Sequence, residues 1–264
     1  LPRSPHDWAK ALCSVPCWQL TPEALLPAAS AHDGAWLVLF GKALDARHLA
    51  QVARLLADHE VEASLYPLGE QAGVPLLLLG ANRFSPELVQ AIKGQEWDID
   101  VCHLAILPTL GEPGLLVMDM DSTAIRIECI DEIARLAGVG DQVAAVTAAA
   151  MQGKLEFADS LRSRVALLEG APVTILDEVA AAMPWMSGLQ LMVDTLKQAG
   201  WTVAIASGGF TRFAGELQQA LGLDAIFANE LAVEGGVLTG QVSGSIVDAA
   251  AKAEALLQLA REHG

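Results

Sequence analysis

The sequence predicts an α/β protein, in which a parallel β-sheet with an inserted block of helices follows a smaller ferredoxin-like α+β unit. Two apolar runs, Leu115–Met118 and Trp201–Ala206, have the composition of strands buried on both faces of a parallel sheet. Residues 119–200, between these runs, show helical spacing instead. Residues 34–106 alternate short strands and helices in the order βαββαβ, which is that of a ferredoxin-like unit.

The N-terminal unit is expected to span residues 1–107. Asp45 suits the N-cap of one helix, and Ser85-Pro86 places proline at the first position of another. Residues 1–33 contain five prolines and predict an irregular leader, and residues 108–113 predict a linker. The other expected elements are the strands Trp36–Phe40, Val61–Tyr66, Leu76–Leu79 and Asp98–Ile106 and the helix Asp45–Ala57.

The second domain is expected to span residues 114–264, with a helical cap at about residues 125–195. Gly138 suits the C-cap of a helix, and Gly235-Gly236 suits the turn of a hairpin. The predicted helices are Ile125–Ala137, Asp141–Met151, Leu155–Leu168, Val173–Met183, Arg212–Leu221 and Ala249–Glu262. The predicted later strands are Ala225–Ala228, Leu231–Val233 and Val237–Val242.

Composition narrows the classes of function. A formal net charge of −16, from 32 acidic and 16 basic residues, disfavours nucleic acid and anionic membranes as partners. No apolar run approaches the length of a membrane span. The cysteines, Cys13, Cys17, Cys102 and Cys129, lack a zinc-binding pattern, so we expect reduced thiols in the cytoplasm.

The most informative segment is Asp119-Met120-Asp121, which directly follows the strand Leu115–Met118. Ligands of open α/β sheets bind at the carboxyl ends of the strands, so both aspartates are expected at a ligand site. The first can attack a phosphoryl group, and the second, pointing the same way, can protonate a leaving alcohol. Paired carboxylates also favour a hard cation such as Mg²⁺. The alternative is that both aspartates merely cap a strand-to-helix turn.

A second polar segment, Ser207-Gly208-Gly209, follows the strand Trp201–Ala206. A hydroxyl group and glycine N–H groups at a strand end can cradle a phosphate. The same tripeptide is also an ordinary turn. Its significance therefore depends on the aspartates, with which it would complete a site for phosphoryl transfer.

Together with a later lysine, these segments resemble the first three motifs of the haloacid dehalogenase (HAD) superfamily. Flanking segments narrow the resemblance to its phosphoserine phosphatases, from about Gly114 to the end of the chain. The N-terminal third resembles the ACT-like domain of some bacterial members, by topology more than by motif. The resemblance implies a HAD-like Rossmannoid sheet with a helical cap. The segments that narrow it are Ile127–Ala134, Met151–Leu155, Ser160–Val165 and Ala206–Thr211.

The resemblance implies an activity and a role for each matching residue. The activity would be Mg²⁺-dependent hydrolysis of O-phosphoserine to serine and phosphate, the last step of serine biosynthesis. Asp119 would be the nucleophile and Asp121 the general acid and base, with Mg²⁺ held by Asp119 and the main-chain carbonyl of Asp121. Ser207 and Gly208 would bind the phosphoryl oxygens. Lys252 would neutralise charge on the nucleophile and the phosphate.

Four further residues occupy positions at which the family contacts its substrate. The resemblance implies that Glu128 binds the ammonium group of phosphoserine and that Arg164 binds its carboxylate. It also implies that Met151 and Phe157 shield the substrate from the cap. Taken alone, Glu128 is better explained as a helix N-terminal acid and Arg164 as a solvated arginine, and the two apolar residues suit a core.

One departure from the family pattern concerns the end of the chain. The family's fourth motif, a Gly-Asp-Gly-x-x-Asn-Asp strand end, supplies a further Mg²⁺-binding aspartate after the helix that holds Lys252. The chain ends at Gly264, before such a motif, and begins with Leu1 rather than methionine. We therefore expect a fragment or a truncated product of a longer protein, which by itself would be a poor enzyme.

Other functions stay open on the sequence alone. The chain could be a HAD phosphatase for another small phosphate ester. It could also be a non-catalytic phosphoacceptor or metal-binding regulator, which would need Asp119 but not Asp121. Residues 34–106 suit a serine-sensing module, and the pairing of ACT-like units by their sheet edges favours a homodimer.

Overall fold

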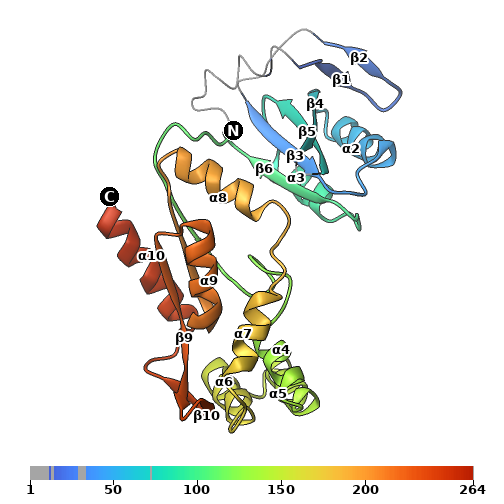
Figure 1. Cartoon of the computed structure of the whole chain (residues 1–264). Helices are drawn as coiled ribbons and strands as arrows, with labels where there is room; N and C mark the ends of the chain where they lie inside the picture. The colour runs from blue at the N-terminus through green and yellow to red at the C-terminus, as the bar shows by residue number, and fades with distance from the viewer. Residues whose placement is uncertain (1–11, 13–14, 29–33, 72, 264) are drawn as a thin grey trace. The chain divides into compact units, whose positions relative to one another are not determined.

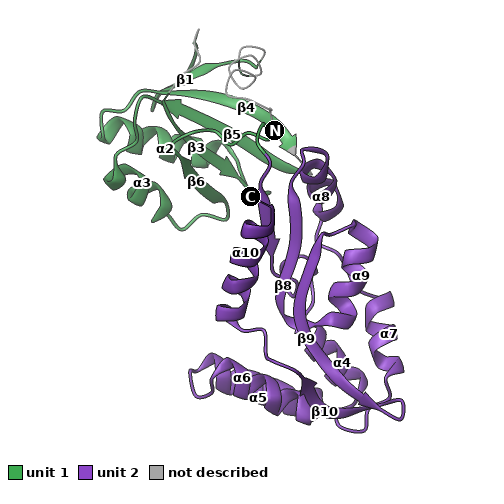
Figure 2. Ribbon diagram, turned by 90° about the vertical axis from the view of Figure 1, so that its left-hand side faces the viewer, with its two compact units in different colours: residues 1–112 green, residues 113–264 purple. Residues whose placement is uncertain are grey.

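The computed structural model in Figure 1 describes residues 12, 15–28, 34–71 and 73–263. The chain divides into two units, Leu1–Glu112 and Pro113–Gly264, which Figure 2 shows in green and purple. Each unit buries its own set of apolar side chains. Among the described helices, none combines the length and the apolar composition that crossing a membrane requires.

Unit 1 holds a six-stranded antiparallel sheet in the order β2-β1-β4-β5-β3-β6. Helices α2 (Ala46–Asp58) and α3 (Pro86–Lys93) contribute Val52 and Leu88 to the apolar core of the unit. The predicted order βαββαβ is confirmed for β3 to β6 and their two helices. The strands are β1 (Trp18–Leu20), β2 (Leu25–Pro27), β3 (Ala35–Phe40), β4 (Ala63–Gln71), β5 (Val74–Ala81) and β6 (Asp100–Leu104).

The prediction of an irregular leader over residues 1–33 is wrong for part of that segment. β1 and β2 form a hairpin, and β1 pairs with β4. Each of these strands has three residues, which is too short for a period-two pattern to be recognised. Pro27 is tolerated because β2 lies at the edge of the sheet. Residues 1–11, 13–14 and 29–33, including Cys13, lie outside the described residues.

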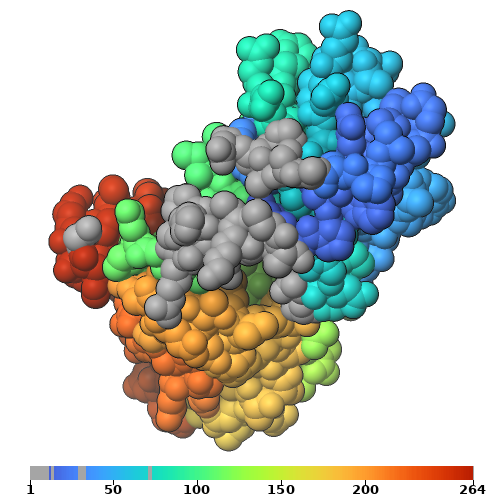
Figure 3. Space-filling model, turned by 90° about the horizontal axis from the view of Figure 1, so that it is seen from above, coloured from blue at the N-terminus to red at the C-terminus, as the bar shows by residue number. Residues whose placement is uncertain are grey.

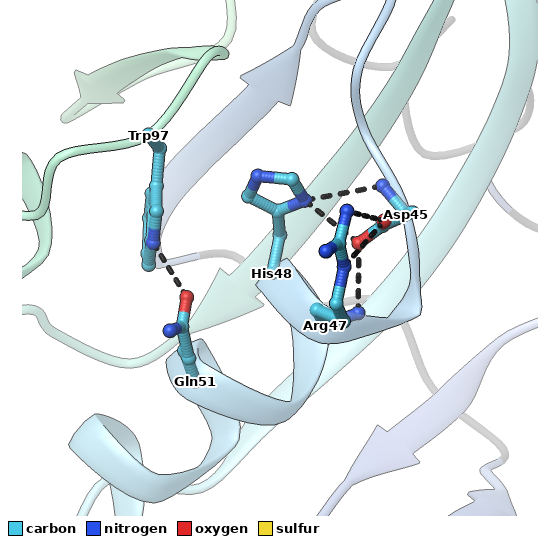
Figure 4. Close-up of polar contacts among 5 residues, drawn as sticks. All are labelled: Asp45, Arg47, His48, Gln51 and Trp97. Carbon is cyan, nitrogen blue, oxygen red and sulfur yellow. Dashed lines mark hydrogen bonds and ion pairs between the residues drawn. The ribbon is translucent and has the colours of Figure 1, made fainter.

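Helix α2 begins at a capping box, as the N-cap prediction for Asp45 requires. The Asp45 carboxylate accepts hydrogen bonds from Arg47 N at 2.9 Å and Arg47 Nε at 2.8 Å (Figure 4). The Asp45 N–H in turn donates to His48 Nδ1. The Arg47 guanidinium lowers the pKa of Asp45 to about 2. Farther along α2, Gln51 Oε1 accepts a hydrogen bond from Trp97 Nε1, which ties the helix to the segment before β6.

Unit 2 holds a four-stranded sheet in the order β10-β9-β8-β7. β7, β8 and β9 are parallel, as predicted, whereas β10 is antiparallel to β9. Gly235 and Gly236 both adopt positive φ, 59° and 82°, in the turn between β9 and β10. β9 is one strand where two were predicted, because the chain stays in the sheet through Asn229 and Glu230. The strands are β7 (Leu115–Met118), β8 (Thr202–Phe210), β9 (Ala225–Glu234) and β10 (Val237–Ser243).

The helices of unit 2 fall into two groups. α4 to α7 cluster near the hairpin of β9 and β10, whereas α9 and α10 lie along opposite faces of the sheet (Figures 1 and 2). The surfaces of α8 and α10 are visible in orange and red in Figure 3. The helices are α4 (Cys129–Leu136), α5 (Gly140–Met151), α6 (Phe157–Ala166), α7 (Thr174–Ala181), α8 (Leu189–Gln198), α9 (Thr211–Leu221) and α10 (Ala249–His263).

Helix α8 was not foreseen, and the expected cap of residues 125–195 includes most of it. Its residues Leu189 and Val193 are buried in the core of unit 2, and the helix contacts β8 and α9. It therefore packs with the sheet rather than with α4 to α7. Leu191 and Met192 on the same helix are exposed, which obscures the pattern of one apolar face.

Two isolated β-bridges lie at the ends of the group α4–α7. The chain enters and leaves the group side by side, because Ile125 bridges Trp185 and Arg126 N donates to Pro184 O at 2.9 Å. This pairing explains why α4 begins at Cys129 rather than at Ile125. At the other end of the group, Leu238 N of β10 donates at 2.8 Å to the carbonyl of Ala171, which lies in the turn between α6 and α7.

Candidate active site

The two aspartates project from a tight turn at the carboxyl end of β7. The carbonyl of Met120 accepts hydrogen bonds from the N–H groups of Thr123, Ala124 and Ile125, at 2.8 to 3.2 Å. Ser122 completes the turn with a φ of +54°, which is uncommon outside glycine. β7 ends at Met118, and this turn leaves the side chains of both aspartates at the edge of the sheet.

A cavity of about 150 Å³ lies at this edge, where β7, β8, α4, α6 and α10 meet. All the residues predicted for the site line it, with the exception of Met151. Met151 ends α5 and is 86% exposed, so the structure does not bring it to the others. The lining residues are Asp119, Asp121, Glu128, Ile130, Phe157, Leu161, Arg164, Ser207, Gly208, Gly209, Phe210 and Lys252.

Asp119 is held between a main-chain donor and a lysine. Its Oδ1 accepts from Met120 N at 2.9 Å, and its Oδ2 lies 3.1 Å from Lys252 Nζ. Lys252 is in the first turn of α10, where the Asp248 carboxylate accepts from Ala251 N at 2.9 Å and caps the helix. The start of α10 thereby sets the position of the ammonium group opposite the predicted nucleophile.

Ser207 and Gly208 lie within β8, which runs to Phe210 rather than ending at Ala206 as predicted, and they form a bulged loop where the register with β9 shifts between Ala206 and Phe210. This loop is fixed by a buried asparagine that the sequence does not single out. Ser207 is fully buried, and its Oγ accepts from Gly209 N at 3.0 Å. Asn229 Nδ2 donates to Gly208 O, and Asn229 Oδ1 accepts from Val247 N, both at 2.8 Å. Asn229 therefore ties this loop to the segment that begins α10. In the sequence, Asn229 stands out only as a polar residue within a largely apolar strand.

Asp121 is the most strongly perturbed carboxyl group of the site. Burial is the largest cause that raises the pKa of Asp121, and hydrogen bonds from Cys129 oppose it. With the smaller effect of the charges of Glu128 and Asp119, which also raise it, the pKa is about 6. Cys129 N donates to Asp121 Oδ1 at 3.3 Å. A carboxyl group with such a pKa can carry a proton near neutral pH, which is what a general acid requires.

Glu128 and Arg164 reach the same cavity from α4 and α6. Glu128 is the N-cap residue of α4, yet its side chain makes no capping hydrogen bond. Instead, Glu128 Oε1 accepts from Ser122 Oγ at 2.7 Å. Arg164 Nε donates to Ser160 O at 3.4 Å, and Arg164 lines the cavity. A carboxylate and a guanidinium therefore stand in one small cavity beside the aspartate pair.

The donor set of the cavity suits a hard divalent cation. Three carboxylates, those of Asp119, Asp121 and Glu128, line it, and their mutual repulsion contributes to the raised pKa of Asp121. A cation would relieve this repulsion, and oxygen ligands are those that Mg²⁺ prefers. Within the described part of the chain, no three His, Cys, Asp or Glu side chains are grouped so that they alone could hold a metal ion.

Comparison with known proteins agrees with this geometry. The model of the haloacid dehalogenase-like hydrolase family matches residues 116–264. A Haemophilus influenzae protein named phosphoserine phosphatase is 53% identical over 167 residues, which is 63% of this chain and 53% of that protein. The chain thus spans about half the length of this relative, and the same holds for a relative from Vibrio cholerae.

The chain is also similar to solved structures of proteins named as phosphoserine phosphatases. The unliganded crystal structure of a probable phosphoserine phosphatase from Vibrio cholerae has a TM-score of 0.68 and 37% identity, covering 96% of this chain and 78% of that one. A substrate-bound phosphoserine phosphatase has a TM-score of 0.55 and 40% identity, covering 58% of this chain and 73% of that one.

The family match covers the whole of the sheet and the helices that carry the cavity. The aspartate pair, the serine–glycine segment and the lysine lie together in that cavity. The chain belongs to the haloacid dehalogenase-like hydrolase family.

Proposed function

We propose that the protein hydrolyses O-phosphoserine to serine and phosphate through an aspartyl phosphate on Asp119. The observation that carries the proposal is the meeting of Asp119, Asp121 and Lys252 with Glu128 and Arg164 in one cavity. The first three suit phosphoryl transfer, and the last two suit an amino acid. The cavity of about 150 Å³ is also smaller than those that hold drug-sized ligands, which favours a small ester.

In the first proposed step, an Asp119 carboxylate oxygen attacks phosphorus and the bond between phosphorus and the serine oxygen breaks. The electrons of that bond go to the serine oxygen, which takes the proton of the Asp121 carboxyl group. Ser207 Oγ and the N–H groups of its loop bind the phosphoryl oxygens, and Lys252 offsets their negative charge.

In the second proposed step, water attacks the phosphorus of the aspartyl phosphate. Asp121, now a carboxylate, accepts a proton from that water, and the bond between phosphorus and Asp119 breaks. Inorganic phosphate leaves, and Asp119 and Asp121 return to their starting states. One carboxyl group thus serves both steps, which is consistent with its raised pKa.

Mg²⁺ is the proposed cofactor, held by the Asp119 carboxylate and the main-chain carbonyl of Asp121. When bound, it would neutralise negative charge that the phosphoryl group and the nucleophile bring together. The chain's own Lys252 supplies one further positive charge at 3.1 Å from Asp119. The oxygen-only donors of the cavity support this choice of metal.

Glu128 and Arg164 are the proposed readers of the substrate. The Glu128 carboxylate would accept hydrogen bonds from the ammonium group of phosphoserine, while Ser122 holds one of its oxygens. The Arg164 guanidinium would bind the substrate carboxylate. Arginine suits this role because its planar group of N–H donors can bond both oxygens of a carboxylate. The ring of Phe157 would cover the ester from the cap.

Activity assays with the Asp119→Asn variant test the proposal. This assay and those below use a protein that includes the family's fourth motif. With Mg²⁺ present, its wild type should release phosphate from phosphoserine, and Asp119→Asn should lose this turnover and beryllium-fluoride binding, because the amide is a poor nucleophile. Asp141→Asn, which changes an exposed aspartate of α5, is the matched control and should stay active. Substantial turnover by Asp119→Asn would remove Asp119 from the role of nucleophile.

The same assay separates the rival functions. A phosphatase for another small ester would turn over that ester and ignore phosphoserine. A regulator that only accepts phosphate would be labelled once at Asp119 by a small acyl phosphate, and Asp121→Asn would not change that labelling. Fast turnover of phosphoserine that depends on both aspartates supports the proposed enzyme.

We also propose that unit 1 is an ACT-like domain, that the protein is cytoplasmic, and that the domain pairs with a second copy. The sheet order β4-β5-β3-β6 supports the first point, and the free thiols of Cys102 and Cys129 support the second. Serine titration followed by calorimetry would detect an effector, and sedimentation would give the oligomeric state.

A further inference from the structure

The two glycines after Ser207 are required by different neighbours. Neither Gly208 nor Gly209 has a φ in the left-handed region, so other residues could adopt their backbone conformations. Glycine is required at both positions because nearby atoms leave no room for a Cβ. A Cβ on Gly208 would lie 2.6 Å from Cζ of Phe157, whereas a Cβ on Gly209 would lie 2.6 Å from Oδ2 of Asp121.

The space beside Gly209 is closed on several sides. The same Cβ would lie 2.6 Å from Cε of Met120, a fully buried side chain, and 3.2 Å from Oγ of Ser207. Ser207 Oγ is itself engaged, because it accepts from Gly209 N at 3.0 Å. A methyl group added here would lie too close to both Asp121 Oδ2 and Met120 Cε, so these side chains must move.

Asp121 is the neighbour whose movement matters to the chemistry. Its Oδ1 accepts from Cys129 N at 3.3 Å, so the carboxyl group is held on one side by α4 and limited on the other by Gly209. Ordinary van der Waals contact with carbon is about 3.5 Å, so a methyl group at Gly209 would push Oδ2 away by about 1 Å.

We propose that Gly209 is a positioning residue for proton transfer: its lack of a side chain lets the Asp121 carboxyl group lie against the bulged end of β8, within reach of the leaving oxygen. This proposal rests on the proposed function. Misplacement of a reacting group by about 1 Å can slow catalysis about 100-fold. Gly209 touches no substrate in this role and acts through Asp121.

The proposal predicts that the effect of Gly209→Ala depends on the leaving group. When the ester bond of phosphoserine breaks, its electrons go to an alkoxide oxygen that needs the proton of Asp121. When p-nitrophenyl phosphate reacts, the electrons go to a phenolate that is stable without a proton. Displacing Asp121 should therefore slow transfer from the first ester to Asp119 far more than transfer from the second.

Single-turnover measurements by rapid mixing, with Mg²⁺ and with enzyme in excess, test this dependence. Gly209→Ala should slow transfer from phosphoserine about 10- to 100-fold and change the first release of p-nitrophenolate by less than about threefold. With p-nitrophenyl phosphate in excess, the variant should show a burst followed by slow turnover, because hydrolysis of the aspartyl phosphate also uses Asp121. The KM for phosphoserine should change little.

Two controls separate positioning from damage to the fold. Gly215→Ala in α9, where a Cβ would meet nothing within 4 Å, should keep full activity on both esters. In an Asp121→Ala background, adding Gly209→Ala should cost no further rate with phosphoserine, since the carboxyl group is gone. A crystal structure of Gly209→Ala should show Asp121 displaced and Ser207 in place.

Equal losses on both esters, or no loss on phosphoserine, would overturn the proposal. Failure of the proposed function looks different, because wild type would then hydrolyse p-nitrophenyl phosphate but not phosphoserine. In that case the same comparison is made between p-nitrophenyl phosphate and an alkyl phosphate that wild type does hydrolyse. The leaving-group dependence is expected for any alkyl ester.

Discussion

At the scale of single residues, Glu128 illustrates how a side chain can leave its usual local role. It occupies the N-cap position of α4, where a carboxylate would ordinarily accept from the N–H groups of the first turn. Its Oε1 accepts instead from Ser122 Oγ at 2.7 Å. Ser122 lies in the turn after β7 and has a φ of +54°. We infer that this contact prepares Glu128 for an ammonium group.

Removing the Ser122 hydroxyl group should weaken substrate binding more than catalysis. In Ser122→Ala, Glu128 loses the donor that orients it, so the KM for phosphoserine should rise about three- to tenfold while kcat changes less than about threefold. Steady-state kinetics measures both constants. Ser163→Ala, at an exposed position of α6, is the control. A loss confined to kcat would contradict this role for Ser122.

Arg164 should discriminate between esters by their carboxylates. Arg164→Ala should lower kcat/KM for phosphoserine at least about 30-fold, since losing a charged hydrogen-bonded partner costs about 2 kcal/mol or more. Phosphoethanolamine keeps the ammonium group but lacks the carboxylate, so its hydrolysis should change little. Arg162→Ala, whose side chain pairs with Asp159 at an exposed site on the same helix, is the control. Similar losses on both esters would make Arg164 a structural residue.

At the scale of elements, Asp224 joins the beginning of β8 to α8. Asp224 Oδ2 accepts from Val203 N at 2.7 Å, and Lys197 Nζ of α8 donates to Oδ1 at 2.8 Å. Burial raises the pKa of Asp224, but the hydrogen bonds from Lys197 and Val203 outweigh it, so the pKa is lowered overall. These contacts hold the start of the strand whose other end carries Ser207.

Asp224 should therefore stabilise unit 2 in a pH-dependent way. Because the folded-state pKa lies below the unfolded value, the contribution is present above the unfolded pKa and is lost as pH falls through the folded pKa. Asp224→Ala should lower the free energy of unfolding by about 1–2 kcal/mol near pH 7, since Val203 N is left without its acceptor.

Denaturant unfolding of Asp224→Ala and wild type at several pH values measures this difference. It should narrow as pH falls below about 4, the ordinary range of an aspartate. Glu254→Gln, which neutralises an exposed carboxylate on α10, is the control and should show little effect at any pH. A difference that does not depend on pH would mean that the charge of Asp224 has no part in it.

At the scale of the whole molecule, the two units have separate apolar cores. Leu79 is fully buried in the core of unit 1, and Phe213 is fully buried in the core of unit 2. The cores share no residue, and the chain between them runs through the linker segment 108–113. Each unit is therefore expected to unfold in its own transition.

Calorimetry of two core variants tests this independence. Leu79→Ala should lower the Tm of one transition and Phe213→Ala that of the other, each by a loss of about 2–5 kcal/mol. Leu257→Ala, at a half-exposed position of α10, is the control for removing an apolar side chain at the surface. One transition shifted by both variants would show that the units fold together.

The sequence by itself determined the features that depend on local chemistry. Several features follow from short stretches of chain: the buried strands next to Asp119 and Ser207, the capped start of α2 at Asp45, and the glycine turn between β9 and β10. The family resemblance added Lys252, which lies far from the aspartates in the chain. It also added Glu128, Arg164 and Phe157, and the structure brings all four to the same cavity.

Only the tertiary structure decided the contacts between distant segments. The tie from Asn229 to Gly208, the approach of Asp121 to Gly209 and the packing of α8 on the sheet join residues that no local period relates. The three-residue strands β1 and β2 form because β4 offers an edge with which to pair. Hydrogen bonds and van der Waals contacts act over a few ångströms of space, whatever the separation along the chain, so these features appear only once the chain has folded.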